Sequence, residues 1–159
     1  MSQALLTGIS RTTEPRAMLR RFLALDAVVT GANGLAYCLA SGPLGRLLGV
    51  DATLLLGLGV LLTAYAAGVG HLASRRQPPA TGVMVVVEAN LVWAALSATA
   101  LVAWLSPSTA GTVWILVQAA TVAGFGALQW SALRAARGVS AKSRRPPGGR
   151  AGRDFADTP

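Results

Sequence analysis

Four long apolar segments divide the chain and constrain its fold more than any other feature. They cover Phe22–Ser41, Ala52–Ala73, Val83–Leu105 and Thr112–Leu133. Each runs for about 20 residues, the length of helix that spans the ~30 Å hydrocarbon core of a bilayer. The connections between them are short and rich in turn-forming residues, so consecutive helices should be antiparallel neighbours. The sequence therefore predicts an all-α fold, an integral membrane antiparallel four-helix bundle.

The composition excludes a water-soluble monomer. Only 13% of the residues are charged and 53% are hydrophobic, whereas soluble domains carry about 25% charged residues. Cys38 is the single cysteine, so it cannot build a disulfide scaffold. Residues 35–38 look like a lipoprotein cleavage box, but the bulky Tyr37 stands where a small residue is needed. The apolar run is also too long for a signal peptide, so we expect the first segment to remain as a span.

The distribution of basic residues orients the bundle. All of the 14 lysine and arginine residues except Arg46 lie before the first segment, between the second and third, or after the fourth. The positive-inside rule therefore places both termini and the middle loop in the cytoplasm, with the spans in the cytoplasmic membrane. This divides the chain into a cytoplasmic basic N-terminal segment (1–21), a transmembrane domain (22–133) and a basic cytoplasmic tail (134–159).

The tail is rich in arginine, glycine and proline and is expected to be disordered. One interpretation is that its charge only enforces the topology, and another is that it attracts anionic lipid head groups. Nucleic-acid binding is a weaker interpretation because aromatic side chains do not interleave with the arginines. The expected partners are therefore the lipid bilayer, anionic head groups, and a second copy or another membrane protein, with no nucleic acid.

Small residues predict how the helices pack. Lipid gives helices no hydrophobic reason to associate, so close contact must come from small side chains. The second segment carries three such pairs at a spacing of four residues, Thr63 with Ala67, Ala64 with Gly68 and Ala66 with Gly70. We expect Gly68→Leu to disrupt this packing.

A weak internal repeat relates the two halves of the chain. The first and third segments each carry an acidic residue near the start and an asparagine further on, Asp26 with Asn33 and Glu88 with Asn90. A duplicated helical hairpin would produce this pattern.

Each apolar segment also carries a polar side chain at a similar depth. At 1.5 Å per residue these side chains lie about 6–9 Å inside the basic boundary. They are Asp26, His71, Glu88 and Gln129. Ionisable groups at membrane depth are costly and commonly mark functional sites. The sequence therefore predicts a polar binding cluster just below the cytoplasmic surface.

Helical spacing extends this cluster. Thr30, Asn33 and Tyr37 follow Asp26 at i+4, i+7 and i+11, which is one helical face that should point into the bundle. Asn90 lies about 200° around its helix from Glu88, at ~100° per residue, so only one of the two can share that interior. Residues near mid-depth are candidates to line a cavity; they are Asn33, Tyr65, Trp93 and Phe125.

The cluster has two interpretations. It is either a mutually satisfied network that holds the helices together, or a site for protons or cations in which two carboxylates and a histidine titrate together. A metal site is weakly supported, because one histidine and two acids lack ligand spacing. The chain has no glycine-rich phosphate loop, serine–histidine–aspartate order or cysteine pair. We therefore expect no catalytic residues, metal or cofactor.

Residues 25–37 and 87–93 resemble the small four-span integral membrane proteins common in actinobacteria, which implies a membrane bundle and no particular activity. Four spans with an acid in the first also look partly like the small multidrug resistance transporters, although Glu88 and the long basic tails depart from that family. Two functions follow: a non-enzymatic structural or accessory membrane component, or a proton-coupled transporter of small cationic or lipophilic compounds using Asp26 and Glu88.

Overall fold

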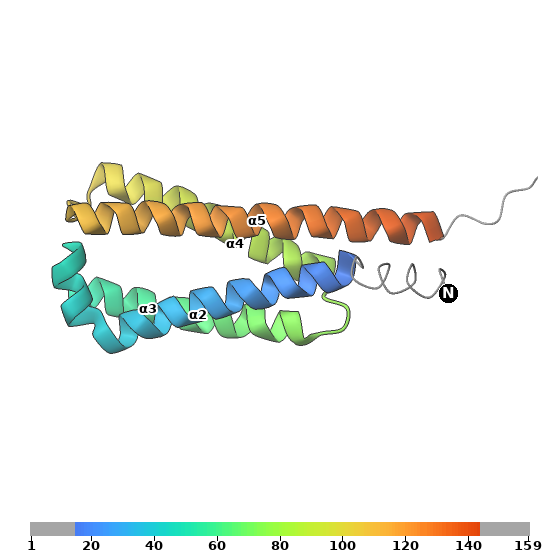
Figure 1. Cartoon of the computed structure of the whole chain (residues 1–159), viewed down its shortest axis with the longest axis horizontal. Coiled ribbons are helices and arrows are strands. Elements are labelled where there is room, and N and C mark those ends of the chain that lie inside the picture. The colour runs from blue at the N-terminus through green and yellow to red at the C-terminus, as the bar shows by residue number, and fades with distance from the viewer. Residues whose placement is uncertain (1–14, 144–159) are drawn as a thin grey trace, which may run out of the picture.

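The computed structural model describes residues 15–143, which form four helices (Figure 1). They are α2 (Pro15–Leu48), α3 (Ala52–Ser74), α4 (Ala80–Ala103) and α5 (Thr109–Ser143). All four are long and apolar enough to cross a membrane. The described residues contain no strand, so the predicted all-α bundle is confirmed and the protein is a multi-pass membrane protein.

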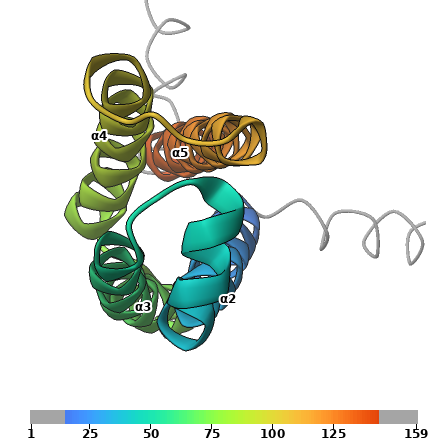
Figure 2. The same ribbon diagram turned by 90° about the vertical axis from the view of Figure 1, so that its left-hand side faces the viewer.

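The helices form two antiparallel hairpins, α2–α3 and α4–α5, which lie one above the other in Figure 1. The hairpins meet mainly through α2 and α5, whereas α3 hardly touches α4. Arginines cluster where α2 begins, where α3 connects to α4, and toward the end of α5; we call this the basic end. The two hairpin connections lie at the opposite, far end, which faces the viewer in Figure 2.

Glycines bring α2 and α3 into backbone contact. A Cβ atom on Gly34 would lie 2.8 Å from the backbone nitrogen of Thr63, and one on Gly59 would lie 2.8 Å from the backbone nitrogen of Cys38. The prediction for Gly68 was wrong, because a Cβ atom there would meet nothing within 4 Å. A spacing of four residues identifies a stripe of small residues on a helix, but not whether that stripe faces a neighbour.

A kink bends α2 at Ala40, whose φ of −131° and ψ of 29° are not helical. Pro43 follows within the helix, where it lacks an N–H group and its ring disturbs the preceding turn. Beyond the kink, residues 41–48 form a short helical segment at the far end (Figure 2). There the Ser108 backbone N–H donates to the Leu48 carbonyl at 3.0 Å and the Ser108 hydroxyl to the Leu47 carbonyl at 2.7 Å, which ties the two hairpins together.

The last helix is longer than predicted. It continues past Leu133 to Ser143, so the first part of the tail expected to be disordered is helical. Alanine, leucine and arginine, all good helix formers, dominate residues 132–137. No proline occurs between Pro107 and Pro146 to interrupt the helix. The remaining parts of the predicted terminal segments, 1–14 and 144–159, lie outside the described residues.

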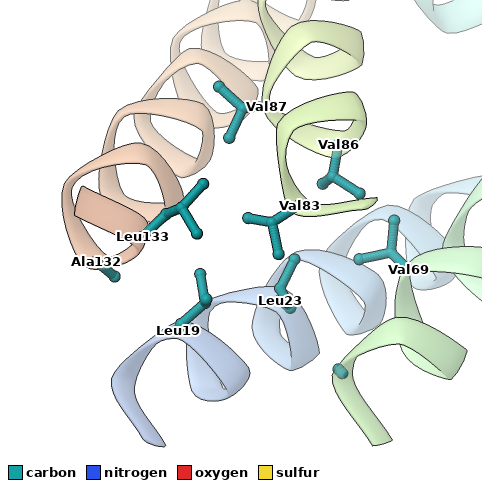
Figure 3. Close-up of a cluster of buried hydrophobic side chains, with 9 residues drawn as sticks. Leu19, Leu23, Val69, Val83, Val86, Val87, Ala132 and Leu133 are labelled. Carbon is teal, nitrogen blue, oxygen red and sulfur yellow. The ribbon is translucent and has the colours of Figure 1, made fainter. Parts of the chain in front are cut away.

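An apolar core closes the basic end of the bundle. All four helices contribute to it, and the buried side chains face one another in Figure 3. They are Leu19, Leu23, Val69, Ala73, Val83, Val86, Val87, Ala132 and Leu133. The outer faces of the helices are also apolar, with Leu39 and Val102 among the most exposed side chains. The helices are thus apolar on their outer faces as well as in the core, as expected for a protein surrounded by lipid.

Candidate functional site

A single carboxylate lies at the centre of the bundle, directly beyond the apolar core. Asp26 on α2 is completely buried, with 0% of its surface exposed. Its Oδ1 accepts a hydrogen bond from the Thr30 hydroxyl at 3.1 Å. Its Oδ2 accepts one from Asn90 Nδ2 on α4 at 2.9 Å and one from Gln129 Nε2 on α5 at 2.7 Å. Three of the four helices therefore supply atoms to one carboxyl group.

The fourth helix joins through Tyr65 on α3. The Tyr65 hydroxyl lies 3.2 Å from Asn90 Oδ1 and 3.3 Å from the Val86 carbonyl oxygen, and it donates to these acceptors. Asn90 Nδ2 also lies 3.4 Å from Gln129 Oε1. We call these five residues the Asp26 network: Asp26, Thr30, Tyr65, Asn90 and Gln129. Because every helix contributes a member, the network fixes the rotation of each helix about its own axis.

The polar residues predicted at one depth do not all meet. Asp26 and Gln129 are hydrogen-bonded, whereas the side chains of His71 and Glu88 are exposed on the surface of the bundle. His71 Nε2 lies 3.2 Å from Arg75 Nη2, one turn further along the chain. Of the two candidates on α4, Asn90 faces the interior, because it follows Val83, Val86 and Val87 at helical spacing.

All three hydrogen bonds that Asp26 accepts come from neutral groups. An ionised carboxylate can only accept hydrogen bonds, and the Thr30 hydroxyl and the two amide nitrogens all donate to it. No two acids share the site, since Glu88 is on the surface. Within residues 15–143, no three His, Cys, Asp or Glu side chains gather into a group that could hold a metal ion.

A second set of polar side chains lies closer to the far end, between α2 and α5. The Tyr37 hydroxyl oxygen accepts hydrogen bonds from Trp114 Nε1 at 2.7 Å and from Gln118 Nε2 at 2.8 Å. Gln118 Oε1 accepts from Asn33 Nδ2 at 3.0 Å. We call these four residues the Tyr37 network: Asn33, Tyr37, Trp114 and Gln118. Asp26, Thr30 and Tyr37 are all buried, and Asn33 is half-buried. The predicted polar face of α2 therefore points into the bundle.

Gln118 was not predicted as a site residue, although its spacing from Gln129 contained a signal. Gln118 and Gln129 are eleven residues apart, and so are Asp26 and Tyr37. Eleven residues make about three helical turns, so both members of each pair share one face. Because α2 and α5 are antiparallel, equal spacings allow both pairs to meet, Asp26 with Gln129 and Tyr37 with Gln118.

Cavities occupy the space between the hairpins on the far-end side of the Asp26 network. The large cavity has a volume of about 660 Å³ and is lined mainly by α2 and α5, including all four residues of the Tyr37 network. The side cavity, of about 290 Å³, lies toward α3 and α4 and is lined by Trp93 and Trp104 among others. The small cavity, of about 150 Å³, is lined by Thr30, Tyr65, Asn90 and Trp93.

The predicted cavity-lining residues have separate positions. Trp93 lines all three cavities, Tyr65 lines the small one and Asn33 lines the large one. Phe125 is buried, with 8% of its surface exposed, and is not among the lining residues of these three cavities. Tyr37, Trp93 and Trp114 line both the large and the side cavity, so their rings stand between the two.

The large cavity is covered along the bundle axis at both ends. Leu44, Leu47 and Leu48 of the kinked segment line it at the far end, and Thr30 of the Asp26 network lines it toward the basic end. Its lateral wall includes Val28 and Val117, which are 67% and 53% exposed on the lipid-facing surface. The cavity therefore borders the surrounding bilayer at its side.

No family model matches the chain, and neither a curated protein nor a solved structure matches it.

Proposed function

We propose that the protein is a non-enzymatic accessory component of the bacterial cytoplasmic membrane that holds a small lipophilic molecule in the large cavity. The observation that carries the proposal is the lateral wall of this cavity, in which lipid-facing residues such as Val28 and Val117 take part. A molecule that enters there must first dissolve in the bilayer. The volume of about 660 Å³ lies within the ~300–1,000 Å³ range of ligand pockets.

The lining of the large cavity favours an uncharged occupant. Its polar members are neutral, and no charged side chain is among its lining residues. An unpaired charge is costly in a medium of low dielectric constant, so a cation or an anion would bind poorly there.

The orientation follows from the positive-inside rule. The arginines of the basic end, such as Arg20, Arg75 and Arg137, support a cytoplasmic position for this end and for both termini. Basic side chains at the cytoplasmic surface attract anionic lipid head groups by ~1 kcal/mol each. The large cavity would then lie in the outer leaflet.

A blocked cavity tests this proposal. Ala36 is exposed and lines the large cavity, so Ala36→Trp should fill it without displacing the backbone. The matched control is Ala64→Trp, on the exposed side of α3. We expect 2-methylnaphthalene to bind the wild-type protein in lipid nanodiscs saturably, at about one molecule per chain. We expect binding to Ala36→Trp to be weaker by about tenfold, since overfilling costs ~1–3 kcal/mol.

Radiolabelled 2-methylnaphthalene in equilibrium dialysis gives the measurement, with empty nanodiscs as the reference for partitioning into lipid. Ala64→Trp should bind like the wild-type protein. Uptake that does not saturate and equals that of empty nanodiscs for all three proteins would show that the cavity is not a binding site.

Proton-coupled transport is a second candidate, favoured by the small cavity. Thr30 and Asn90 line this cavity, and both also hydrogen-bond to Asp26. A small cation that reached the small cavity would bind beside the ionised Asp26 carboxylate, and the proton that Asp26 carries in the cation-free state would be released into the same cavity. The transport mechanism would then use Asp26 without Glu88, which is exposed on the other side of α4.

Asp26→Asn should abolish proton-driven flux if this second candidate is correct, because the amide cannot release a proton. Glu88→Gln is the matched control and should leave the flux unchanged. The measurement is uptake of tetramethylammonium, a cation small enough for the small cavity, by proteoliposomes under an imposed pH gradient. Wild-type proteoliposomes that take up no more than protein-free vesicles would rule out transport of this cation and leave the binding proposal intact.

A further inference from the structure

We propose that the Tyr37 hydroxyl donates a hydrogen bond to a carbonyl oxygen of the molecule in the large cavity. The ligand class is then an uncharged, flat lipophile that carries a carbonyl group. This inference rests on the proposed function, since it names the chemistry of the molecule that the large cavity holds.

The first support is the hydrogen bonding of Tyr37 itself. Its oxygen accepts from Trp114 Nε1 at 2.7 Å and from Gln118 Nε2 at 2.8 Å. An indole N–H can only donate, and an amide nitrogen can only donate. Both lone pairs of the Tyr37 oxygen are therefore occupied, while its own hydrogen has no acceptor among the residues that the structure describes. Tyr37 is 6% exposed, so bulk solvent does not supply that acceptor.

The second support is that the other hydroxyl groups of the large cavity are engaged. The Thr30 hydroxyl donates to Asp26 Oδ1 at 3.1 Å, and the Thr121 hydroxyl donates to the Val117 carbonyl at 2.8 Å. Of the three hydroxyl groups among the lining residues, only that of Tyr37 keeps a hydrogen to donate. Burying a donor without an acceptor costs ~1–3 kcal/mol, so a ligand that supplies the acceptor gains affinity.

The third support is the shape and polarity of the surroundings. The rings of Tyr37, Trp93 and Trp114 contribute to the lining, and aromatic rings pack favourably against other flat rings. The rest of the lining is largely aliphatic, with Leu44, Leu48 and Leu62 among its members. A flat ring system with one well-placed oxygen satisfies both the apolar walls and the free Tyr37 hydroxyl.

A pair of probes of nearly the same shape tests this assignment. 2-Methyl-1,4-naphthoquinone has two carbonyl groups, and 2-methylnaphthalene has none. Binding of the quinone is followed by quenching of tryptophan fluorescence in nanodiscs, because Trp93 and Trp114 line the large cavity. The hydrocarbon is measured by its displacement of the quinone, with both concentrations expressed as mole fractions in the lipid. One net hydrogen bond is worth ~1 kcal/mol, so we expect the wild-type protein to prefer the quinone about fivefold.

Tyr37→Phe frees Trp114 Nε1 and Gln118 Nε2, which donate to the Tyr37 oxygen and also line the large cavity, so it is made in the background Asn33→Leu/Trp114→Phe/Gln118→Leu. In that background, Tyr37→Phe should bring the preference close to one while the hydrocarbon still binds, which shows that the cavity remains intact. Tyr65→Phe is the matched control, because it removes a hydroxyl that donates to Asn90 in the Asp26 network. This control should keep the wild-type preference. In the infrared spectrum, the carbonyl stretch of the bound quinone should lie at a lower wavenumber in the background that keeps Tyr37 than in the same background with Tyr37→Phe.

Each result decides a different statement. Equal affinity of the wild-type protein for both probes would overturn the role of Tyr37 and leave the lipophile-binding function in place. A preference for the quinone that persists when Tyr37→Phe is combined with Asn33→Leu/Trp114→Phe/Gln118→Leu would also overturn it, since another donor would then hold the carbonyl. Binding of neither probe would overturn the proposed function together with this inference.

Discussion

Asp26→Leu is expected to lower the free energy of unfolding by about 2–4 kcal/mol. A buried donor left without an acceptor costs ~1–3 kcal/mol. An interhelical hydrogen bond in a membrane contributes ~0.6–1.7 kcal/mol. Leucine has the branching of aspartate with methyl groups in place of the oxygens, so it opens no cavity, and its larger volume adds to the cost. It removes the acceptor that the Thr30 hydroxyl and the amides of Asn90 and Gln129 share. Reversible unfolding in dodecyl sulfate, followed by circular dichroism, gives the measurement.

Asp26→Asn separates the loss of hydrogen bonds from the loss of charge. The asparagine carbonyl can still accept from Asn90 and Gln129, and its amide can donate to the Thr30 oxygen. This variant should therefore stay within ~1 kcal/mol of the wild-type protein. An Asp26→Leu protein as stable as the wild type would mean that the Asp26 network does not hold the helices together.

Gly59→Leu should destabilise the bundle by about 3 kcal/mol or more, the upper range for overfilled cores. A Cβ atom at this position would lie 2.8 Å from the Cys38 backbone nitrogen and 2.8 Å from the Gly34 carbonyl oxygen. Backbone atoms cannot move aside as a side-chain end can, so α2 and α3 would have to separate. The same unfolding measurement in dodecyl sulfate reports the loss, and a cysteine crosslink between the two helices would report the separation.

The matched control is Gly68→Leu, on the opposite face of α3. No atom lies within 4 Å of a Cβ built there, and Gly68 is exposed. The change should stay within ~0.5 kcal/mol, and it can even stabilise the helix because glycine is a poor helix former. Equal damage from both substitutions would show that the contact at Gly59 is not special.

The fold could be predicted from the sequence because lipid leaves few alternatives. Long apolar runs in a bilayer must form helices that satisfy their own backbone groups. Short connections then determine the antiparallel order. The ends of the helices were harder to predict. Helix α5 continues to Ser143 through residues that form helices well but are charged, such as Arg134 and Arg137. A search for long apolar runs leaves such charged residues out of the predicted helix.

The candidate site was predicted only in part. Depth in the membrane gives the position of a residue along its helix, but not the direction in which it faces around the helix axis. His71 and Glu88 have the depth of Asp26 but lie on outward faces, whereas Asn90 and Tyr65 face inward. Rotation about the helix axis follows from the apolar face of each helix, and in a membrane protein that face is weakly marked because both sides are apolar. The equal spacings of Asp26 to Tyr37 and Gln118 to Gln129 were the stronger signal.

The sparse contact between α3 and α4 bears on how the chain is made. Helices α2 and α3 touch along much of their length through Gly34 and Gly59, so this hairpin can assemble while the ribosome is still synthesising the second half. The second hairpin then docks as a unit, aligned by Asn90 and Gln129 on Asp26. Biogenesis would thus proceed in two stages, with the carboxylate of the first hairpin serving as the docking point for the second.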